Sequence, residues 1–413
     1  MKRAVITGVG VVSPLGSGWN NWVEGLRAGG SGVGAIDLRD PRDEPLACRV
    51  AAQCEDFEAE QWMESAELRR VPRAVPMALA ACDEALCSAA LDAPTAAEKG
   101  EIHVVIGSGG GGFSFAEAQF ALWHRGETKS LSPYAVSSSI AGMISSEISI
   151  ARGFRGRSHT FSDGCTSSSD AFGNALDLIR NGRAHTIICG GADSPITPAT
   201  IAAFCLMRAV PTHWNGEPTR ASRPFDRARD GFVLGEGAWM FVVEEREHAL
   251  ARGAAIWAEV AGFGATCEAF HRVALRDPQE AARAMTDALD DAKVAPEAVD
   301  YVNLHGTATS LNDPLETAAV KIALGHHAQR TLMSATKSQI GHPQGASGAA
   351  GIAATLAAIK HSFAPPTLNL DDPDDGCDLD YVAHRSRPLE VQTALCDCLG
   401  FGSKNAALIL RAP

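Results

Sequence analysis

The chain has 413 residues, of which 46% are hydrophobic and 21% charged, and its formal net charge at pH 7 is −13. This length allows two or three domain-sized units with a large buried core. The acidic balance argues against nucleic acid as the main partner, so an acidic partner would need a local basic patch. No apolar stretch is long enough to span a bilayer, so no membrane insertion is expected.

The eleven cysteines are scattered without paired spacing, and their number is odd. This pattern fits a reducing cytoplasm better than a disulfide framework, so we expect a cytoplasmic protein. Cys396 and Cys398 are too close together and too isolated to form a metal site, and no metal is expected.

A buried strand is predicted at residues 3–12, and its Gly8-Val9-Gly10 resembles the start of a dinucleotide-binding loop. Ser13 stands where the third glycine belongs, and no acidic residue closes a second strand at the usual distance. The pattern therefore argues against NAD binding.

An alanine-rich helix is predicted at residues 72–90, followed by a strand at residues 102–106. Four consecutive glycines follow at residues 109–112 and indicate close backbone approach or open space. The run lacks the Lys-Ser/Thr pair of a phosphate-binding loop, so nucleotide phosphate is not its expected ligand.

A predicted strand at residues 158–161 stops at Asp163-Gly164, and apolar residues then recur at helical spacing until Asn181-Gly182. Cys165 therefore lies on a tight turn beside the start of a helix. Free N–H groups and the positive end of the helix dipole favour a thiolate there. This is the geometry of a nucleophile elbow that carries sulfur; the alternative is a small buried core cysteine.

The order of predicted elements repeats along the chain. Strands at residues 186–189 and 238–243 complete a first set, and the segments that repeat it are residues 256–264, 278–292, 299–304, 331–359 and 406–410. The repeat predicts a duplicated α/β fold with halves at residues 1–253 and 254–413, whose parallel sheets are buried between helix layers. Ligands of such sheets bind beyond the carboxyl ends of the strands.

The repeat places three reactive side chains on one rim. Cys165 opens a helix in the first half, His342 opens the equivalent helix in the second half, and His305 ends the strand equivalent to residues 102–106. A lone histidine is more often structural than catalytic. Two histidines at strand ends of a duplicated fold, facing an elbow cysteine, predict a Cys-His-His site.

Five motifs spread over nearly the whole chain carry a resemblance to a known family. They are Asp163-Gly-Cys165-Thr-Ser-Ser, the long segment Arg223-Pro-Phe-Asp to Gly-Glu-Gly237, His305-Gly-Thr-Ala-Thr-Ser-Leu-Asn-Asp313-Pro-Leu-Glu316, Lys337-Ser-Gln-Ile-Gly-His342 and Gly400-Phe-Gly402. The chain resembles the β-ketoacyl-acyl carrier protein synthases, the condensing enzymes of fatty acid and polyketide synthesis. The resemblance implies a thiolase-like fold with a duplicated five-layered α-β-α-β-α architecture. It also implies no bound cofactor, because the substrates are carried on the phosphopantetheine of an acyl carrier protein.

The same resemblance implies the roles of the site residues. Cys165 would accept an acyl chain as a thioester, because a thiolate is a strong nucleophile at modest basicity. His305 and His342 would promote decarboxylation of the malonyl-carrier protein and stabilise the enolate. The backbone N–H groups of Cys165 and Phe401 resemble the oxyanion hole of the family.

Three further positions support this site by resemblance. Lys337 either favours neutral imidazole by like-charge repulsion or forms a structural ion pair with Asp313 or Glu316. Thr307 and Thr309 resemble the residues of the family that bind the phosphopantetheine arm.

The acyl pocket is expected beside the glycine loop. In the fatty acid enzymes this loop presents a bulky aliphatic residue that lines the chain tunnel, and Gly110 takes that position here. Glycine would leave room for a longer or stiffer chain, such as a conjugated polyene; Phe204 and Phe401 are the other expected pocket residues. The alternative is that Gly110 serves only the loop conformation and Phe113 or Phe401 fills the space.

Acyl carrier proteins are acidic, so this acidic chain needs basic residues to dock one. The candidates are Arg69, Arg70, Arg73 and Arg208. The resemblance also implies a dimer, either of two copies or of one copy with a related ketosynthase or chain-length-factor subunit.

Departures from the family pattern favour a specialised or polyketide-type synthase. Gly351 replaces the usual Glu nine residues after the second histidine, and Ser403-Lys404 replaces Gly-Thr after Gly400-Phe-Gly402. One alternative is a CoA-dependent thiolase, suggested by Gly341-His342-Pro343, but thiolases lack the His305 motif. The other is a non-catalytic chain-length factor, a class of subunit that usually lacks the nucleophile.

Overall fold

The computed structural model describes residues 1–413, and its strands fall into two matching sets of five. The first set is β1 (Ala4–Ser13), β5 (His103–Gly107), β6 (Ser158–Phe161), β7 (Thr186–Asp193) and β9 (Gly237–Glu245). The second set is β10 (Ala258–Cys267), β11 (Tyr301–Asn303), β12 (Leu332–Ser334), β15 (Thr393–Gly400) and β16 (Lys404–Arg411).

Both sets have the same topology. In each, the third, second, fourth, fifth and first strands lie side by side in that order. The second strand pairs in parallel with the third and fourth, and the fifth pairs antiparallel with the fourth and first. This equivalence agrees with the repeat in the sequence, and we propose residues 1–253 and 254–413 as the two halves.

A short ladder joins the two sets. β1 pairs with β10 from Ala4↔Val260 to Ile6↔Ala258, so the two sheets meet edge to edge. β6 lies at one open end of the combined sheet and β12 at the other.

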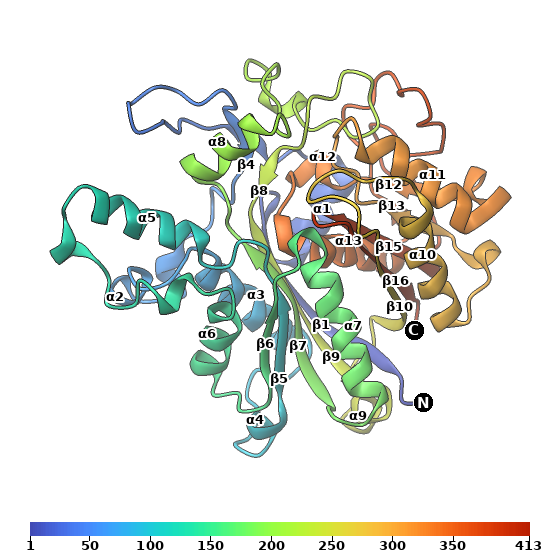
Figure 1. The fold of residues 1–413 in the computed structure, drawn as a ribbon. Helices are drawn as coiled ribbons and strands as arrows, with labels where there is room; N and C mark the ends of the chain where they lie inside the picture. The colour runs from blue at the N-terminus through green and yellow to red at the C-terminus, as the bar shows by residue number, and fades with distance from the viewer.

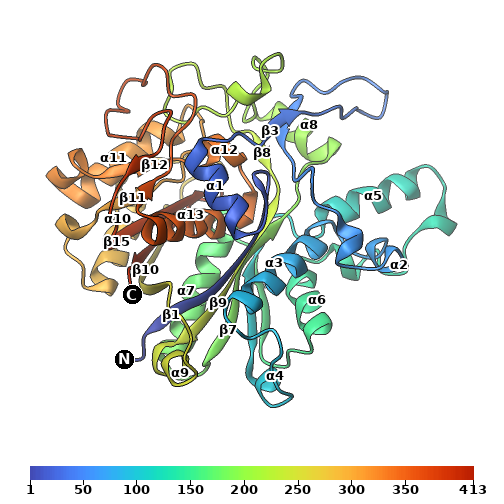
Figure 2. The ribbon, with the colours of Figure 1, turned by 180° about the vertical axis from the view of Figure 1, so that it is seen from behind.

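Two helices lie between the sheets, and others cover the outer faces (Figures 1 and 2). The inner pair is α7 (Ser167–Arg180) and α13 (Ser347–His361), whose apolar side chains share one core with both sheets. α3 (Ala74–Ser88) and α6 (Met143–Arg152) cover the first sheet, while α10 (Gln279–Ala292) and α11 (Asn312–Leu324) cover the second. The layers are therefore α-β-α-β-α, as expected.

A small residue allows the inner helix α13 to pack closely against β11 and β15 of the second sheet. A Cβ at Gly351 of α13 would lie 2.8 Å from both Asn303 Oδ1 and Cys396 Sγ. At this position, which departs from the family pattern, a glutamate would force the side chains of Asn303 and Cys396 to shift. All eleven cysteines are free thiols.

The remaining elements extend from this core. They are α1 (Trp19–Ala28), α2 (Ser65–Leu68), α4 (Glu98–Glu101), α5 (Phe113–His124), α8 (Pro198–Leu206), α9 (Arg246–Ala251), α12 (Lys337–Ile340), the small sheet of β3 (Val33–Ala35), β4 (Val50–Ala52) and β8 (Leu234–Gly235), and the short strands β2 (Gly16–Ser17), β13 (Phe363–Ala364) and β14 (Arg387–Pro388). α8, β4 and β8 lie at the same end of the molecule as the start of α7 (Figure 1). None of the helices is both long and apolar enough to cross a membrane.

Candidate active site

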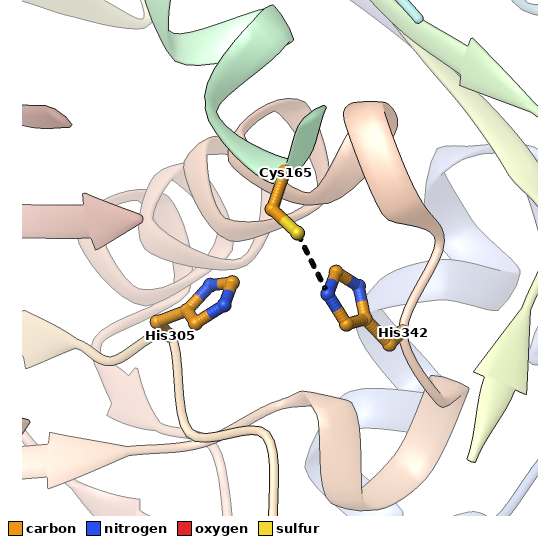
Figure 3. A group of neighbouring side chains, drawn as sticks. All are labelled: Cys165, His305 and His342. Carbon is orange, nitrogen blue, oxygen red and sulfur yellow. Dashed lines mark hydrogen bonds between the residues drawn. The ribbon is translucent and has the colours of Figure 1, made fainter. Parts of the chain in front are cut away.

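Three side chains from different elements meet at the carboxyl ends of the strands (Figure 3). Cys165 lies in the helical turn Gly164–Thr166 that leads into α7, and His305 lies two residues after β11. His342 lies in the link between α12 and α13, five residues before α13 begins, and so does not open the helix itself as predicted. Cys165 Sγ is 3.1 Å from His342 Nε2, and the two imidazole centroids are 5.3 Å apart.

The hydrogen bonds of His342 determine which nitrogen carries its proton. Nδ1 accepts the backbone N–H of Gln344 at 3.1 Å, and Ser347 Oγ lies 2.9 Å from the same nitrogen. A backbone N–H can only donate, so the proton of the neutral ring lies on Nε2 and points at Cys165 Sγ. Ser347 was not identified from the sequence, because a serine five residues downstream carries no signal of this contact.

Contacts with Lys337 determine which nitrogen of His305 carries its proton. The ammonium of Lys337 donates to the His305 carbonyl at 2.6 Å and lies 3.3 Å from Nδ1. An ammonium has no acceptor, so Nδ1 is unprotonated and Nε2 carries the proton. Lys337 forms no ion pair with Asp313 or Glu316, which decides between the two roles considered for it.

Both imidazoles are neutral at pH 7. Burial lowers the pKa of His305 well below its usual range, and the charge of Lys337 and the neighbouring His342 lower it further. Burial and then Lys337 lower the pKa of His342 in the same direction. Each ring therefore presents one N–H donor to the space beside the sulfur.

The backbone of His305 is anchored by two buried carboxyl groups. Its N–H donates to Glu316 at 2.6 Å and to Asp397 at 3.0 Å, and the N–H of Gly306 donates to Glu316 at 2.9 Å. Cys398, next to Asp397, donates its S–H to the Cys165 carbonyl at 3.1 Å. Asp397 and Cys398 were not assigned to the site from the sequence, because these contacts form only when β15 packs against β11.

The resting sulfur differs from the sequence-based expectation. Burial raises the pKa of the Cys165 thiol to about 11, while the Lys337 charge and the N–H groups of Phe401 and Cys165 oppose that rise. Desolvation outweighs the favourable N–H groups, so Cys165 rests as a thiol instead of a thiolate. The same two backbone N–H groups, which lower the pKa of the thiol, are those of the predicted oxyanion hole, and that role stays a prediction.

A cavity of about 330 Å³ leads to the sulfur. It is lined by Cys165 and both histidines, and also by Thr307, Thr309, Phe401 and Arg208. The hydroxyls of Thr307 and Thr309 lie 3.1 Å apart. The structure thus places the two threonines beside the approach to the nucleophile.

A second cavity of about 240 Å³ lies against the glycine loop. Gly110, Phe113 and Phe204 line it, whereas Phe401 lines the first cavity. A Cβ at Gly110 would meet one atom within 4 Å, Asp193 Oδ1 at 3.4 Å, which is an ordinary contact. Gly110 therefore borders open space, as the pocket hypothesis requires.

The four candidate docking arginines have different surroundings. Arg208 is exposed, lines the first cavity and has no acidic partner. Arg70 pairs with Glu67 beside α2, and Arg73 pairs with the buried Glu236. Arg69 is exposed and without an ion pair, but of the four only Arg208 reaches the cavity that contains Cys165.

Cys165, His305 and His342 also offer ligand atoms that lie within 4.8 Å of one another, a spacing that a metal ion could bridge. Two features work against a cation. The sulfur already contacts His342, and the positive charge of Lys337 lies 3.3 Å from His305 Nδ1. We continue to expect no metal at this site.

Comparison with known proteins places the chain in one family along most of its length. Residues 1–249 match the family described as Beta-ketoacyl synthase, N-terminal domain, and residues 257–371 match Beta-ketoacyl synthase, C-terminal domain. A 3-oxoacyl-[acyl-carrier-protein] synthase 2 of Synechocystis is 41% identical over 99% of this chain and 98% of that protein. The actinorhodin polyketide putative beta-ketoacyl synthase 1 of Streptomyces coelicolor is 39% identical over 99% of this chain and 88% of that protein.

Solved structures agree with this placement. A ketosynthase in complex with its type II polyketide acyl-carrier protein matches with a TM-score of 0.92 and 29% identity, over 100% of this chain and 99% of that chain. The ishigamide ketosynthase/chain length factor matches with a TM-score of 0.89 and 34% identity, over 100% and 99%. Because Cys165 is present and the sequence relatives are named as synthases, a chain-length factor or a thiolase is not favoured. The chain belongs to the β-ketoacyl synthase family, and its activity is that of a β-ketoacyl-acyl carrier protein synthase, an acyltransferase.

Proposed function

We propose that Cys165 carries the growing acyl chain and that His305 and His342 together serve the decarboxylation of the extender unit. The observation that supports this most directly is the convergence of two imidazole Nε2–H groups on the side of the sulfur. In the loading step, the Cys165 sulfur attacks the thioester of an acyl-carrier protein, the carrier thiol leaves, and the cysteine proton passes to it. The N–H groups of Cys165 and Phe401 stabilise the oxyanion of this step.

The condensing step uses the two histidines as donors. The thioester carbonyl of malonyl-carrier protein accepts N–H groups from His305 and His342, its terminal carboxylate leaves as CO₂, and the bonding electrons form an enolate. The enolate carbon attacks the acyl thioester on Cys165, giving a β-ketoacyl-carrier protein and releasing the cysteine sulfur, which takes up a proton. Neutral imidazoles suit this step, because a cationic ring would pair with the malonyl carboxylate and oppose the loss of CO₂.

The first cavity is the proposed path of the phosphopantetheine arm. Thr307 and Thr309 line it and offer hydroxyls to the amides of the arm. Arg208, at its mouth, would meet the acidic surface of the carrier protein. The substrates thus arrive covalently on a partner, and no cofactor of the enzyme itself is needed.

We further propose that a second ketosynthase-fold subunit covers the face formed by residues 113–150, at the open edge β6. Large apolar side chains are exposed there, among them Phe120 at 64%, Trp123 at 58%, Val136 at 80% and Ile150 at 71%. An apolar face beside an edge strand is typical of an interface. Native mass spectrometry of the purified chain tests a homodimer, and co-expression with a related subunit tests a heterodimer.

Intact-protein mass spectrometry tests the central proposal. Incubation with a carrier protein that bears an acyl group should add one acyl group to the enzyme. Cys165→Ala should prevent that addition and abolish condensation. The exposed Cys87 provides the matched control, since Cys87→Ala should still be acylated. Acylation of the Cys165→Ala variant would refute the assignment of the nucleophile.

A further inference from the structure

The two cavities of the site meet at one side chain. Gln344 is the only residue that lines both the cavity containing Cys165 and the cavity beside the glycine loop. It follows His342 by two residues, and its backbone N–H donates to the imidazole that faces the sulfur. An acyl chain attached to Cys165 and extending into the second cavity would pass this side chain.

The backbone at Gln344 is held in an unfavourable conformation by its surroundings. Its φ is +47°, a left-handed value that residues with side chains seldom adopt. The next residue, Gly345, donates its N–H to the buried Asp193 at 2.8 Å, and a Cβ there would collide with Gly109 N at 2.0 Å. Strain of this kind persists where neighbours fix it and is concentrated at functional sites.

Two polar atoms along the second cavity lack partners. Gln344 Nε2 and Ser194 Oγ are both buried and make no hydrogen bond within the protein. Ser194 is 7% exposed and, like Gln344, lines the second cavity. Buried polar groups are nearly always hydrogen-bonded, so two unpaired groups along one cavity call for a ligand that pairs with them.

The carboxylate of Asp193, which borders the same cavity, is already satisfied. Its oxygens accept from Ser108 Oγ at 2.9 Å and from the N–H groups of Gly109 at 2.6 Å, Gly110 at 3.1 Å and Gly345 at 2.8 Å. The unpaired groups that remain are an amide N–H and a hydroxyl, and both can donate. The matching group on a ligand is therefore a hydrogen-bond acceptor.

We propose that Gln344 and Ser194 form a subsite for keto oxygens of the acyl chain, so that the chain on Cys165 is oxygenated and not a plain hydrocarbon. The inference rests on the proposed function, because it takes Cys165 as the attachment point. A hydrocarbon chain would leave the buried Gln344 amide without a partner, as it is in the free protein, whereas a keto oxygen would satisfy that amide and so bind more favourably. The subsite selects by oxygen content, independently of the room left by Gly110.

Small-molecule thioesters of matched length test the subsite without the carrier protein. N-acetylcysteamine thioesters of an octanoyl chain, and of the same chain with a ketone on the third or fifth carbon, are compared by the rate at which they acylate Cys165. At least one keto chain should load about tenfold faster than the hydrocarbon, the factor that one well-placed buried hydrogen bond supplies. In Gln344→Leu the keto-to-hydrocarbon ratio should fall by about the same factor, and Ser194→Ala should lower it in the same direction.

Two controls separate the possible outcomes. Gln344→Met, an unbranched apolar replacement, serves if the leucine variant does not fold, and Gln61→Leu on the exposed surface should leave the ratio unchanged. A wild-type ratio at or below one, or an unchanged ratio in Gln344→Leu and Gln344→Met, overturns the subsite. If no thioester acylates Cys165 at all, the proposed function itself fails, which is a different result from equal loading of all three.

Discussion

The loops that follow β5 and β11 occupy equivalent places in the two halves and are held by the same device. In the first half, Asp193 at the end of β7 accepts the N–H groups of Gly109 at 2.6 Å and Gly110 at 3.1 Å. In the second half, Asp397 on β15 accepts the N–H of His305 at 3.0 Å. A buried carboxyl on the fourth strand therefore fixes the loop after the second strand in both.

The two loops differ in what they present to the substrate. The glycine loop offers no side chains and borders an open cavity, whereas the other loop carries the imidazole of His305. In the proposed function the two halves divide the work. The first half makes room for the chain and holds it on Cys165, and the second half supplies donors for the extender unit. This division can be tested one position at a time.

Removing the donors of the second half should have the largest effect. His305→Ala and His342→Ala should each lower the condensation rate about a hundredfold to a thousandfold, because each removes an N–H that stabilises the enolate. Both variants should still be acylated on Cys165, as mass spectrometry would show. The exposed His326 gives the control, His326→Ala. Equal loss of loading and condensation would contradict the division between the halves.

Removing the positive charge of Lys337 beside His305 should alter the pH dependence of the condensation rate. Lys337 lowers the pKa of both imidazoles, so Lys337→Met should raise those pKa values and let the rings become cationic at higher pH. The acid limb of the condensation rate should therefore move to higher pH, with a greater loss at about pH 6 than at about pH 8. Lys129→Met provides a surface control. An acid limb that does not move would show that Lys337 acts only through its contact with the His305 carbonyl.

Filling the open space of the first half should change chain length selectively. Gly110→Ile should reduce the rate with the longest accepted acyl chains by about tenfold and leave short chains little affected, because only long chains reach the added side chain. The φ of Gly110 is not in the left-handed region, so the substitution is compatible with the backbone. The effect is measured by letting carrier proteins loaded with acyl chains of different lengths compete for the enzyme. An unchanged profile in a folded variant would leave Gly110 with a conformational role alone.

The smallest effect is expected at the cavity mouth. Arg208→Glu should raise the apparent KM for carrier-bound substrate about threefold to tenfold, and added salt should weaken the wild type in the same direction. Small-molecule thioesters should be unaffected, since they do not use the docking surface. Arg70→Glu, at a residue already paired with Glu67, should change the KM less. If both classes of substrate are slowed alike, Arg208 serves the cavity and not docking.

Local patterns predicted the positions of the site but not its electrostatics. The strand at residues 158–161 and the elbow after it were predicted because a short β-rich run stops at glycine before a helical pattern, and β6 has these bounds. The thiolate was not borne out, because desolvation of Cys165 depends on everything packed around it. The partner of Arg73 is likewise Glu236, which is remote in sequence.

The contacts that were missed share one property. Cys398 and Asp397 contact His305 although they lie more than ninety residues away in the sequence, and neither belongs to a local motif that predicts the contact. Gln344 directly follows the Gly341-His342-Pro343 motif, but that its amide is unpaired can be seen only when every neighbouring donor and acceptor is known. Motifs thus report the chemistry of a residue, and tertiary packing decides its charge and its partners.

The position of β1 has a consequence for how the chain folds. β1 lies between β9 and β10, and both of these partner strands are synthesised more than two hundred residues after it. Contacts between such distant segments are slow to form, because the chain must lose the entropy of closing a long loop before the contacts stabilise it. Until then β1 lacks both of its long-range partner strands, and its apolar residues are open to association with other chains. The strand that joins the two sheets is therefore a segment of the nascent chain that we expect to need protection during synthesis.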